Sequence, residues 1–323
     1  MTDRHTGDKV LNGVLKHIIE LYAAPRYKCE EILGQFLQPK LRALQPRKNE
    51  KAIDYRMRVM RVFAGPRWAL TRRKIALAFT DADKEAYESI NGVLENAFVD
   101  GFNDAAYTMA RTGIDTWPIT LSILSILMAD GIVNLSVRKL KKSKDIAYNE
   151  QRVQSAVHSA VIQGVPPDGL YERVGRSMAN FRQNETISAA RATVYGAADY
   201  GEYFFGLEAQ KMGIEVEKTW LSIMDMRVRP SHKHLHGETI PLKEVFHGYH
   251  GVLRFPHDPE AHPAETMRCR CRMVIHAAGK APAVYTRTVL PTETSAYRKW
   301  RDDRIREAGG ELTLLMRHKR LMG

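Results

Sequence analysis

Histidine and cysteine residues gather in one part of this sequence. Eight of the twelve histidines lie between His232 and His276, and Cys269 and Cys271 fall in the same window. Imidazole nitrogens and thiolate sulfurs are ligands that zinc prefers in proteins. The concentration therefore indicates a metal site, with zinc as the ion. The alternative is that the histidines are polar surface and loop residues and that the cysteines are small buried apolar residues.

Two short elements would bring four of these ligands together. Pro230 suits the first turn of a helix, which predicts a helix over Arg229–Leu235. His232 and His236 would then lie four residues apart on one face. Cys269-Arg270-Cys271 in an extended segment would direct both sulfurs to one side, because strand side chains alternate. The predicted tetrahedral set is His232, His236, Cys269 and Cys271, with His262 as a substitute ligand if Gly237 ends the helix too early.

A second chemical interpretation of the same window is a metal-dependent nuclease or processing enzyme. A histidine and carboxylates around one divalent ion can activate water, and Asp225, His232 and Asp258 are the residues that would do so. The sequence contains no H-E-x-x-H, no Walker phosphate loop and no G-x-S-x-G. Spacing therefore gives catalysis little support.

The elements before this window are helical. From Lys9 to about Gly213 apolar residues recur at helical spacing, and strand-like alternation is nearly absent. A long helix is predicted over Asp81–Arg111, with Thr80 near its cap, and a second one over Glu185–Lys211. The first two thirds of the chain are therefore predicted to be mostly α-helical.

The composition changes after Gly213, where glycine, proline and histidine become frequent. Short strands are predicted over Val216–Ile223, Gly251–Phe255 and Cys271–His276, and a helix near Ser295–Ala308. The predicted fold class is α+β, with a small mixed α/β domain after the helices. The predicted parts are a helical region over 1–213, a compact domain over 214–290 and a basic C-terminal helix or tail over 291–323.

Positive charge is concentrated in the helical region. The chain has 49 lysines and arginines against 37 acidic residues, a net charge of +12, which favours polyanionic partners. Ten basic residues but only two acids lie between Ala43 and Phe79, which predicts a phosphate-contacting surface; the alternative is a solvated or protein-facing helix face. The candidate contacts are Arg47, Lys48, Lys51, Arg56, Arg58, Arg61, Arg72, Arg73 and Lys74, with Arg138, Lys139, Lys141 and Lys142 from a second cluster.

Cysteine usage and hydropathy indicate where the chain acts. Three cysteines exclude a disulfide scaffold, and the polar segment Met1–Lys9 lacks the apolar core of a signal peptide, so synthesis in cytoplasm is expected. Trp117–Ala129 carries no charge, but its thirteen residues are too few to span a bilayer, which needs about 20. We therefore expect a buried core helix there and no membrane partner.

One run of residues resembles a known family. The run begins at Trp220, ends at Cys271, and includes a Leu-x-Gly, a Pro-x-Asp-Pro and a closing Cys-Arg-Cys. Its order and approximate spacing are similar to those of the phage Mu F-like minor head protein domain; His236 departs from the pattern, since the family most often has aspartate there. The matching positions include Trp220, Asp225, Arg227, Arg229, His232, Gly237, Phe246, Asp258, Cys269 and Cys271.

The resemblance implies a structural component of a tailed bacteriophage head and not an enzyme. Such a protein acts in head morphogenesis, associates with the portal and the head shell or scaffold, and lies inside the capsid of the virion near packaged double-stranded DNA after its synthesis in the host bacterial cytoplasm. The sequence shows no base-reading motif, so DNA contact would be independent of sequence. The alternative in this setting is an internal virion protein, ejected with the DNA, that touches the host membrane through Trp117–Ala129.

Overall fold

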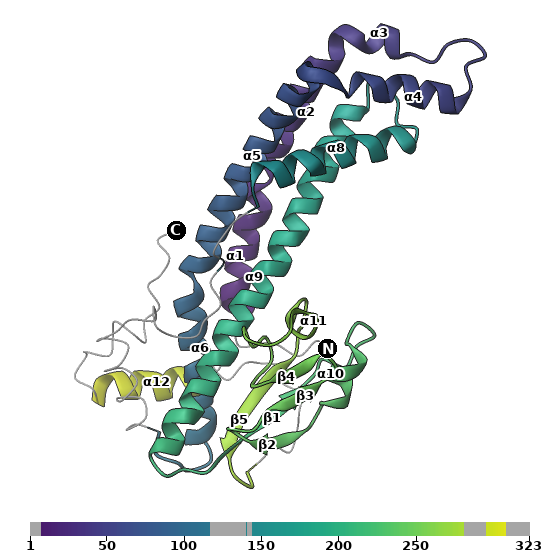
Figure 1. Cartoon of the computed structure of the whole chain (residues 1–323). Helices are drawn as coiled ribbons and strands as arrows, with labels where there is room; N and C mark the ends of the chain where they lie inside the picture. Colours follow the sequence, from purple (N-terminus) through teal and green to yellow (C-terminus); the bar gives the residue numbers. More distant parts are fainter. Residues whose placement is uncertain (1–7, 117–139, 141–143, 281–294, 308–323) are drawn as a thin grey trace. The chain divides into compact units, whose positions relative to one another are not determined.

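The computed structural model of the chain describes residues 8–116, 140, 144–280 and 295–307 (Figure 1). Within these residues long helices precede residue 212 and short antiparallel strands follow it, so the predicted α+β class is confirmed. The chain forms two compact units. We call Val14–Ser89 with Leu140–Ile187 the helical unit, and Met1–Gly13, Ile90–Lys139 and Ser188–Gly323 the mixed unit.

The helical unit consists of helices and one 3-10 turn. α1, α5 and α9 contribute residues to both units, whereas the other elements of the helical unit lie wholly within it. In chain order the elements are α1 (Asp8–Leu21), α2 (Ala23–Leu37), the 3-10 turn Gln38–Lys40, α3 (Leu41–Leu44), α4 (Ala52–Val62), α5 (Gly65–Gly92), α8 (Ile146–Ile162) and α9 (Leu170–Lys211).

A buried polar cluster joins several of these helices. Arg182 Nη2 of α9 lies 2.8 Å from Asp83 Oδ1 of α5, and both side chains are at most 1 % exposed. Asp83 also accepts hydrogen bonds from the Tyr22 hydroxyl at 2.5 Å and from Asn149 Nδ2 of α8 at 3.0 Å. Because a buried charge is tolerated only when it is paired and hydrogen-bonded, this cluster fixes the register of three helices.

The predicted helix start near Thr80 is wrong. Thr80 lies in the middle of α5, where its hydroxyl donates to the carbonyl of Ala76 at 2.9 Å. The helix instead begins at the Gly65-Pro66 pair, where proline costs no hydrogen bond. A threonine that bonds to the preceding turn inside a helix cannot be told from a cap by its sequence alone. The helix then ends at Gly92, and a second helix, α6, covers Leu94–Ala110.

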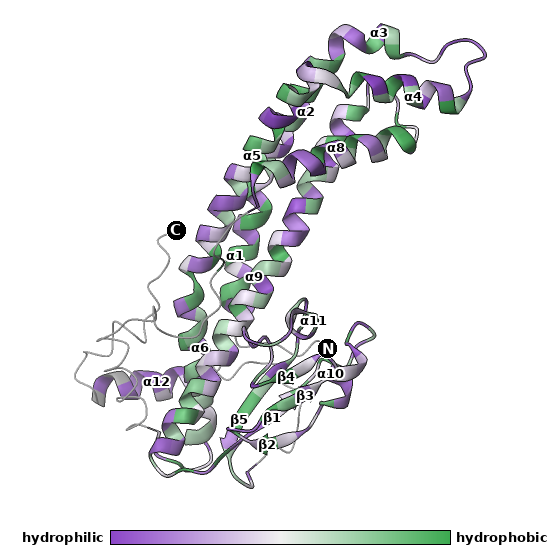
Figure 2. Cartoon of the chain, viewed as in Figure 1, coloured by the Kyte–Doolittle hydropathy of each residue, from purple (hydrophilic) through white to green (hydrophobic). Residues whose placement is uncertain are grey.

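The mixed unit contains two small sheets. β1 (Val216–Leu221) lies between β2 (Thr239–Pro241) and β5 (Arg272–Ala277), and both pairs are antiparallel. β3 (Phe246–Gly248) and β4 (Gly251–Leu253) form a separate hairpin. The predicted strands therefore coincide with β1, β4 and β5. The short helices α10 (Pro230–His234) and α11 (Pro263–Thr266) lie between strands in the chain, and α12 (Ser295–Glu307) is hydrophilic along most of its length (Figure 2).

The core of the mixed unit lies where α6 and the C-terminal part of α9 pack against the sheet. Two glycines make the helix crossing close: a Cβ on Gly101 would lie 1.9 Å from the Ala198 carbonyl oxygen, and one on Gly201 would lie 2.1 Å from that of Phe98. The backbones therefore touch directly. Buried side chains of the core include Phe98, Phe102, Met109, Tyr203, Phe205, Phe255, Met273 and Ile275.

The composition change at Gly213 coincides with the end of α9 at Lys211 and the start of β1 at Val216. It does not coincide with a border between compact units, because residues 188–211 of α9 belong to the mixed unit. Trp117–Ala129 lies outside the described residues. Within the described part of the chain, no helix is both long and apolar enough to cross a membrane.

Candidate metal centre

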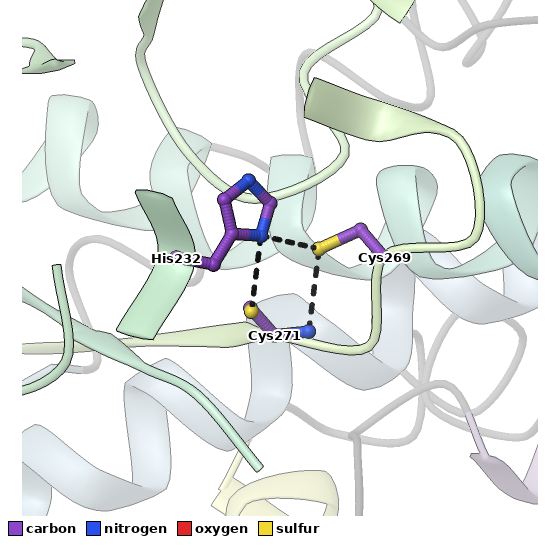
Figure 3. A group of neighbouring side chains, drawn as sticks. All are labelled: His232, Cys269 and Cys271. Atoms are coloured by element: carbon purple, nitrogen blue, oxygen red, sulfur yellow. Dashed lines mark hydrogen bonds between the residues drawn. The ribbon is translucent and has the colours of Figure 1, made fainter. Parts of the chain in front are cut away.

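Three predicted ligands meet in the mixed unit (Figure 3). His232 comes from α10, and Cys269 and Cys271 come from the segment that leads into β5. His232 Nδ1 lies 3.5 Å from Cys269 Sγ and 3.4 Å from Cys271 Sγ. The three side chains are 1 %, 3 % and 2 % exposed in that order, and their ligand atoms all lie within 4.8 Å of one another.

These separations match the edges of a small tetrahedron. With Zn–S bonds of about 2.3 Å, Zn–N bonds of about 2.05 Å and tetrahedral angles, sulfur and nitrogen ligands lie about 3.6 Å apart. The two observed sulfur–nitrogen distances are 3.5 and 3.4 Å. The two sulfur–nitrogen edges of the group therefore have nearly the lengths that a tetrahedral zinc ion requires.

Glu265 sets the orientation of the histidine. Its Oε2 lies 2.9 Å from His232 Nε2, and its side chain is fully buried. Burial raises the pKa of Glu265, but hydrogen bonds from the His250 amide and from His232 outweigh this and leave the pKa below its usual value. An ionised Glu265 favours a proton on Nε2, which leaves the lone pair of Nδ1 directed at the two sulfurs. Metal-binding histidines are commonly oriented by a carboxylate in this way.

The cysteine pair favours one thiolate. The hydrogen bond from the Cys269 thiol is the largest cause of the shift, and it lowers the pKa of Cys271 although burial acts in the opposite direction. Burial and the neighbouring Cys271 raise the pKa of Cys269. A negative charge is therefore stabilised on Cys271, and a divalent cation between the sulfurs would stabilise a second one, since metal-bound thiols lose their protons.

Buried neighbours fix the elements that carry the ligands. The Ser222 hydroxyl donates to the His232 carbonyl at 2.5 Å and accepts from Trp220 Nε1 at 3.1 Å. His257 Nε2 lies 2.9 Å from the carbonyl oxygen of Cys269, and its Nδ1 lies 2.8 Å from Asp199 of α9. The loop before β5 and the start of α10 are thus tied to β1 and α9 by polar contacts in the core.

Two of the five predicted ligands do not join the group. The helix over residues 229–235 is confirmed as α10, but it ends at His234, so His236 lies beyond it and its Nδ1 accepts from the Ser222 amide at 3.0 Å. His262 Nδ1 accepts from the Ala264 amide at 3.2 Å and caps α11. Among the described residues, the cluster of possible metal ligands consists of His232, Cys269 and Cys271. Glu265 was not predicted, because nothing in its local sequence indicates burial beside a histidine 33 residues away.

The proposed nuclease residues are held apart by different partners. Both oxygens of Asp225 are bound by Arg270 at 2.7 Å, and this arginine lowers the pKa of Asp225 to about 2. Asp258 is bound by Arg254 at 2.6 and 2.8 Å. Within the described residues, Asp225, His232 and Asp258 do not form a group that could hold one ion.

Several other motif residues build the fold around the site. The indole of Trp220 is fully buried, with its ring centroid 5.1 Å from those of both His232 and Phe246. Arg229 donates to the carbonyls of Glu265 and Met267. Gly237 has φ +82°, a conformation that glycine adopts without strain. Arg227 is exposed, and its amide donates to Asp225 at 2.9 Å.

The candidate DNA-contacting residues differ in their availability. Arg58 binds both oxygens of Glu50 at 2.8 and 2.7 Å and also donates to the carbonyls of Ala43 and Gln45. Its guanidinium therefore organises the loop over residues 45–51 rather than projecting into solvent. Arg72 is half-buried beside Gln154. The exposed members are Arg47, Lys48, Lys51, Arg56, Arg61, Arg73 and Lys74, while Arg138, Lys139, Lys141 and Lys142 lie outside the described residues.

A family profile described as Phage Mu protein F like protein matches residues 151–274. This stretch contains the three clustered ligands, β1 and the first half of β5. The chain carries a Mu F-like segment. The resemblance based on the run from Trp220 to Cys271 is therefore confirmed, and the Mu F-like match extends upstream through α9 and most of α8.

Two curated relatives are similar to the chain. The NAD(+)–arginine ADP-ribosyltransferase EFV of Enterococcus faecalis is 21 % identical over 258 residues, which cover 73 % of this chain and 51 % of that protein. The minor head protein GP7 of Bacillus phage SPP1 is 24 % identical over 212 residues, which cover 62 % of this chain and 65 % of that protein. The chain thus spans about half to two thirds of the length of these relatives. The comparison with solved structures found no match to this chain.

Proposed function

We propose that this Mu F-like chain is a minor component of a tailed bacteriophage head that acts in head assembly, close to the portal. The observation that carries the proposal is the Mu F-like match over residues 151–274, supported by similarity to a minor head protein over 62 % of the chain. The buried motif residues around Trp220 support a structural use of this segment, since their contacts are made within the fold.

Similarity to an ADP-ribosyltransferase fits the same proposal. The two alignments cover 73 % and 62 % of the chain, so at least 35 % of the chain matches both relatives. We infer that the shared part is the head-type segment and that the transferase carries its activity elsewhere in its length. Incubation of the chain with labelled NAD⁺ and arginine tests this inference: label transferred to arginine would favour an enzyme instead.

DNA contact is assigned to the loop over residues 45–51, which we call the basic loop. Arg47, Lys48 and Lys51 of this loop are exposed, and the bond between Arg58 and Glu50 holds its backbone. Because the carboxylate of Glu50 is paired with Arg58, it does not neutralise the three exposed cations of the basic loop. Such side chains bind phosphate without reading bases.

The test of the DNA contact is the salt dependence of duplex DNA binding. Replacing Arg47, Lys48 and Lys51 by alanine should weaken binding and reduce the slope of log K against log salt by about 0.9 for each phosphate that is no longer neutralised. The matched control replaces three exposed lysines of α1 and α2 by alanine, which removes the same charge at another place: Lys9, Lys16 and Lys28. Equal slopes for the two triple variants would contradict the assignment to the basic loop.

A groove beside α4 supplies a protein-docking surface. It has a volume of about 630 Å³, and its apolar lining includes Ile53, Met57 and Ile162, which are 64 %, 53 % and 58 % exposed. Arg56 and Arg61 flank this lining, and neither forms an ion pair with a described residue. Exposed apolar residues suit a protein partner better than a phosphate backbone, and the two arginines select an acidic one. We assign the groove to an acidic amphipathic helix of another head protein.

Both assignments can be tested in the phage that encodes the chain, with its gene removed and supplied in trans. Wild-type protein should be found in purified heads by mass spectrometry, and its absence from heads would overturn the head assignment. Met57→Glu should be excluded from heads, because it places a charge on the apolar lining. Met212→Glu, an exposed residue outside the groove, is the matched control. Incorporation of both variants at the wild-type level would overturn the docking assignment alone.

A further inference from the structure

We propose that His232, Cys269 and Cys271 bind one zinc ion and that this ion holds the Mu F-like fold together. The proposal goes beyond a role in the phage head and does not depend on it. It rests on the cluster itself: three buried donors converge, and their sulfur–nitrogen separations of 3.5 and 3.4 Å are those of adjacent ligands of one tetrahedral ion.

The donor set selects zinc by its chemistry. Two thiolates and one imidazole are borderline-soft ligands, which disfavour magnesium and calcium because these ions require oxygen. Buried thiols that served only as apolar side chains would need no histidine nitrogen directed at both sulfurs. The oriented Nδ1 of His232 is therefore the feature that separates a metal site from two buried cysteines.

Glu265 completes the site without binding the ion. Its carboxylate holds Nε2 of His232 at 2.9 Å and also accepts from the His250 amide at 2.8 Å and from the Ser231 hydroxyl at 3.2 Å. Gly248 makes room for it, since a Cβ there would lie 2.8 Å from the carboxylate of Glu265. This carboxylate fixes the tautomer and the ring orientation of the imidazole, as outer partners of metal ligands do. Among the described residues no fourth ligand is supplied, so the remaining position is left to water or another small ligand.

The ion would act as a cross-link in a small core. It joins α10 to the start of β5, two elements separated by more than 30 residues of chain. The core around it consists of Trp220, Leu235, Phe246, Leu253 and the two cysteines. This cluster is separate from the larger core around Phe98 and Phe205, so a bond between its two segments would stabilise this part of the mixed unit directly. Metal binding to such a site is coupled to folding, so its removal lowers stability.

The first measurement is the metal content of the full chain, purified without a histidine tag from zinc-supplemented cells under reducing conditions. We expect about one zinc per chain, loss of zinc in Cys269→Ala and Cys271→Ala, and retention in Cys29→Ala. Cys29 is the matched control, because it is a buried free cysteine in α2 of the other unit. Folded protein with less than a tenth of an equivalent of zinc, a different metal at full occupancy, or equal zinc in all four proteins would overturn the proposal.

A second measurement does not depend on the folding of the cysteine variants. Cobalt added to wild-type protein depleted of metal should give a thiolate-to-cobalt charge-transfer band, and zinc should displace it. Glu265→Gln should still bind zinc but with an affinity reduced about 10-fold to 100-fold in competition with a chelator. Wild-type protein without the cobalt band, or with the same thermal unfolding curve in zinc and in chelator, would contradict the proposal. An unchanged zinc affinity in Glu265→Gln would contradict the role of Glu265.

Discussion

Replacement of Gly201 by alanine tests the close crossing of α6 and α9. A Cβ at this position would lie 2.1 Å from the Phe98 carbonyl oxygen and 2.9 Å from the Phe102 amide nitrogen, whereas an ordinary contact begins near 3.4 Å. Both atoms belong to backbone, so no side-chain rotation relieves the overlap. The helices must separate by more than about 1 Å, which loosens the aromatic core around Phe98, Phe102 and Phe205.

The size of the effect follows from two opposing contributions. Overpacking of a core costs about 1 to 3 kcal/mol when side chains can adjust, and backbone contact places this site at the upper end. Alanine in place of a helical glycine contributes about 1 kcal/mol in the other direction. We therefore expect Gly201→Ala to lower the free energy of unfolding by about 2 kcal/mol.

The matched control is Gly34→Ala in α2, where a Cβ would meet nothing within 4 Å. This variant should be more stable than the wild type by about 0.5 to 1 kcal/mol, since only the helix preference changes. Urea unfolding followed by tryptophan fluorescence and circular dichroism measures both variants. A Gly201→Ala protein within about 1 kcal/mol of the wild type would refute the close backbone crossing.

Two further predictions concern buried charges. Arg182→Met leaves the Asp83 carboxylate buried without its partner and should lower the free energy of unfolding by about 3 to 5 kcal/mol. The control is Arg176→Met, at an exposed pair with Glu172, which should change the free energy of unfolding by less than about 1 kcal/mol. Similar effects of the two substitutions would contradict the role of the buried cluster. Burial lowers the pKa of Lys218 to about 7, so between pH 7 and about 10 the folded state holds fewer protons than the unfolded state. The stability of the wild type should therefore rise with pH over this range, and Lys218→Met should remove the rise. Identical pH dependence of stability in the two proteins would contradict the lowered pKa of Lys218.

Residue types and their spacing within short segments were enough to predict most of the helices and strands near the candidate site. Pro230 specifies where α10 begins, and the alternation of side chains in an extended segment places Cys269 and Cys271 on one side. β1, β4 and β5 could be predicted for the same reason, since their signals lie within a few neighbouring residues, whereas β2 and β3 were not predicted. The donor types alone indicated a thiolate and imidazole site.

Only the tertiary structure decided which histidine accompanies the cysteines and what holds it. α10 ends at His234, and the carboxylate of Glu265 approaches from α11 to fix the ring of His232. Likewise, charge counting could not tell that Arg58 binds Glu50 and organises a loop. Residue types and local periods can be read along the chain, but the partner of a buried polar group depends on which distant segments pack together, and no local pattern encodes that.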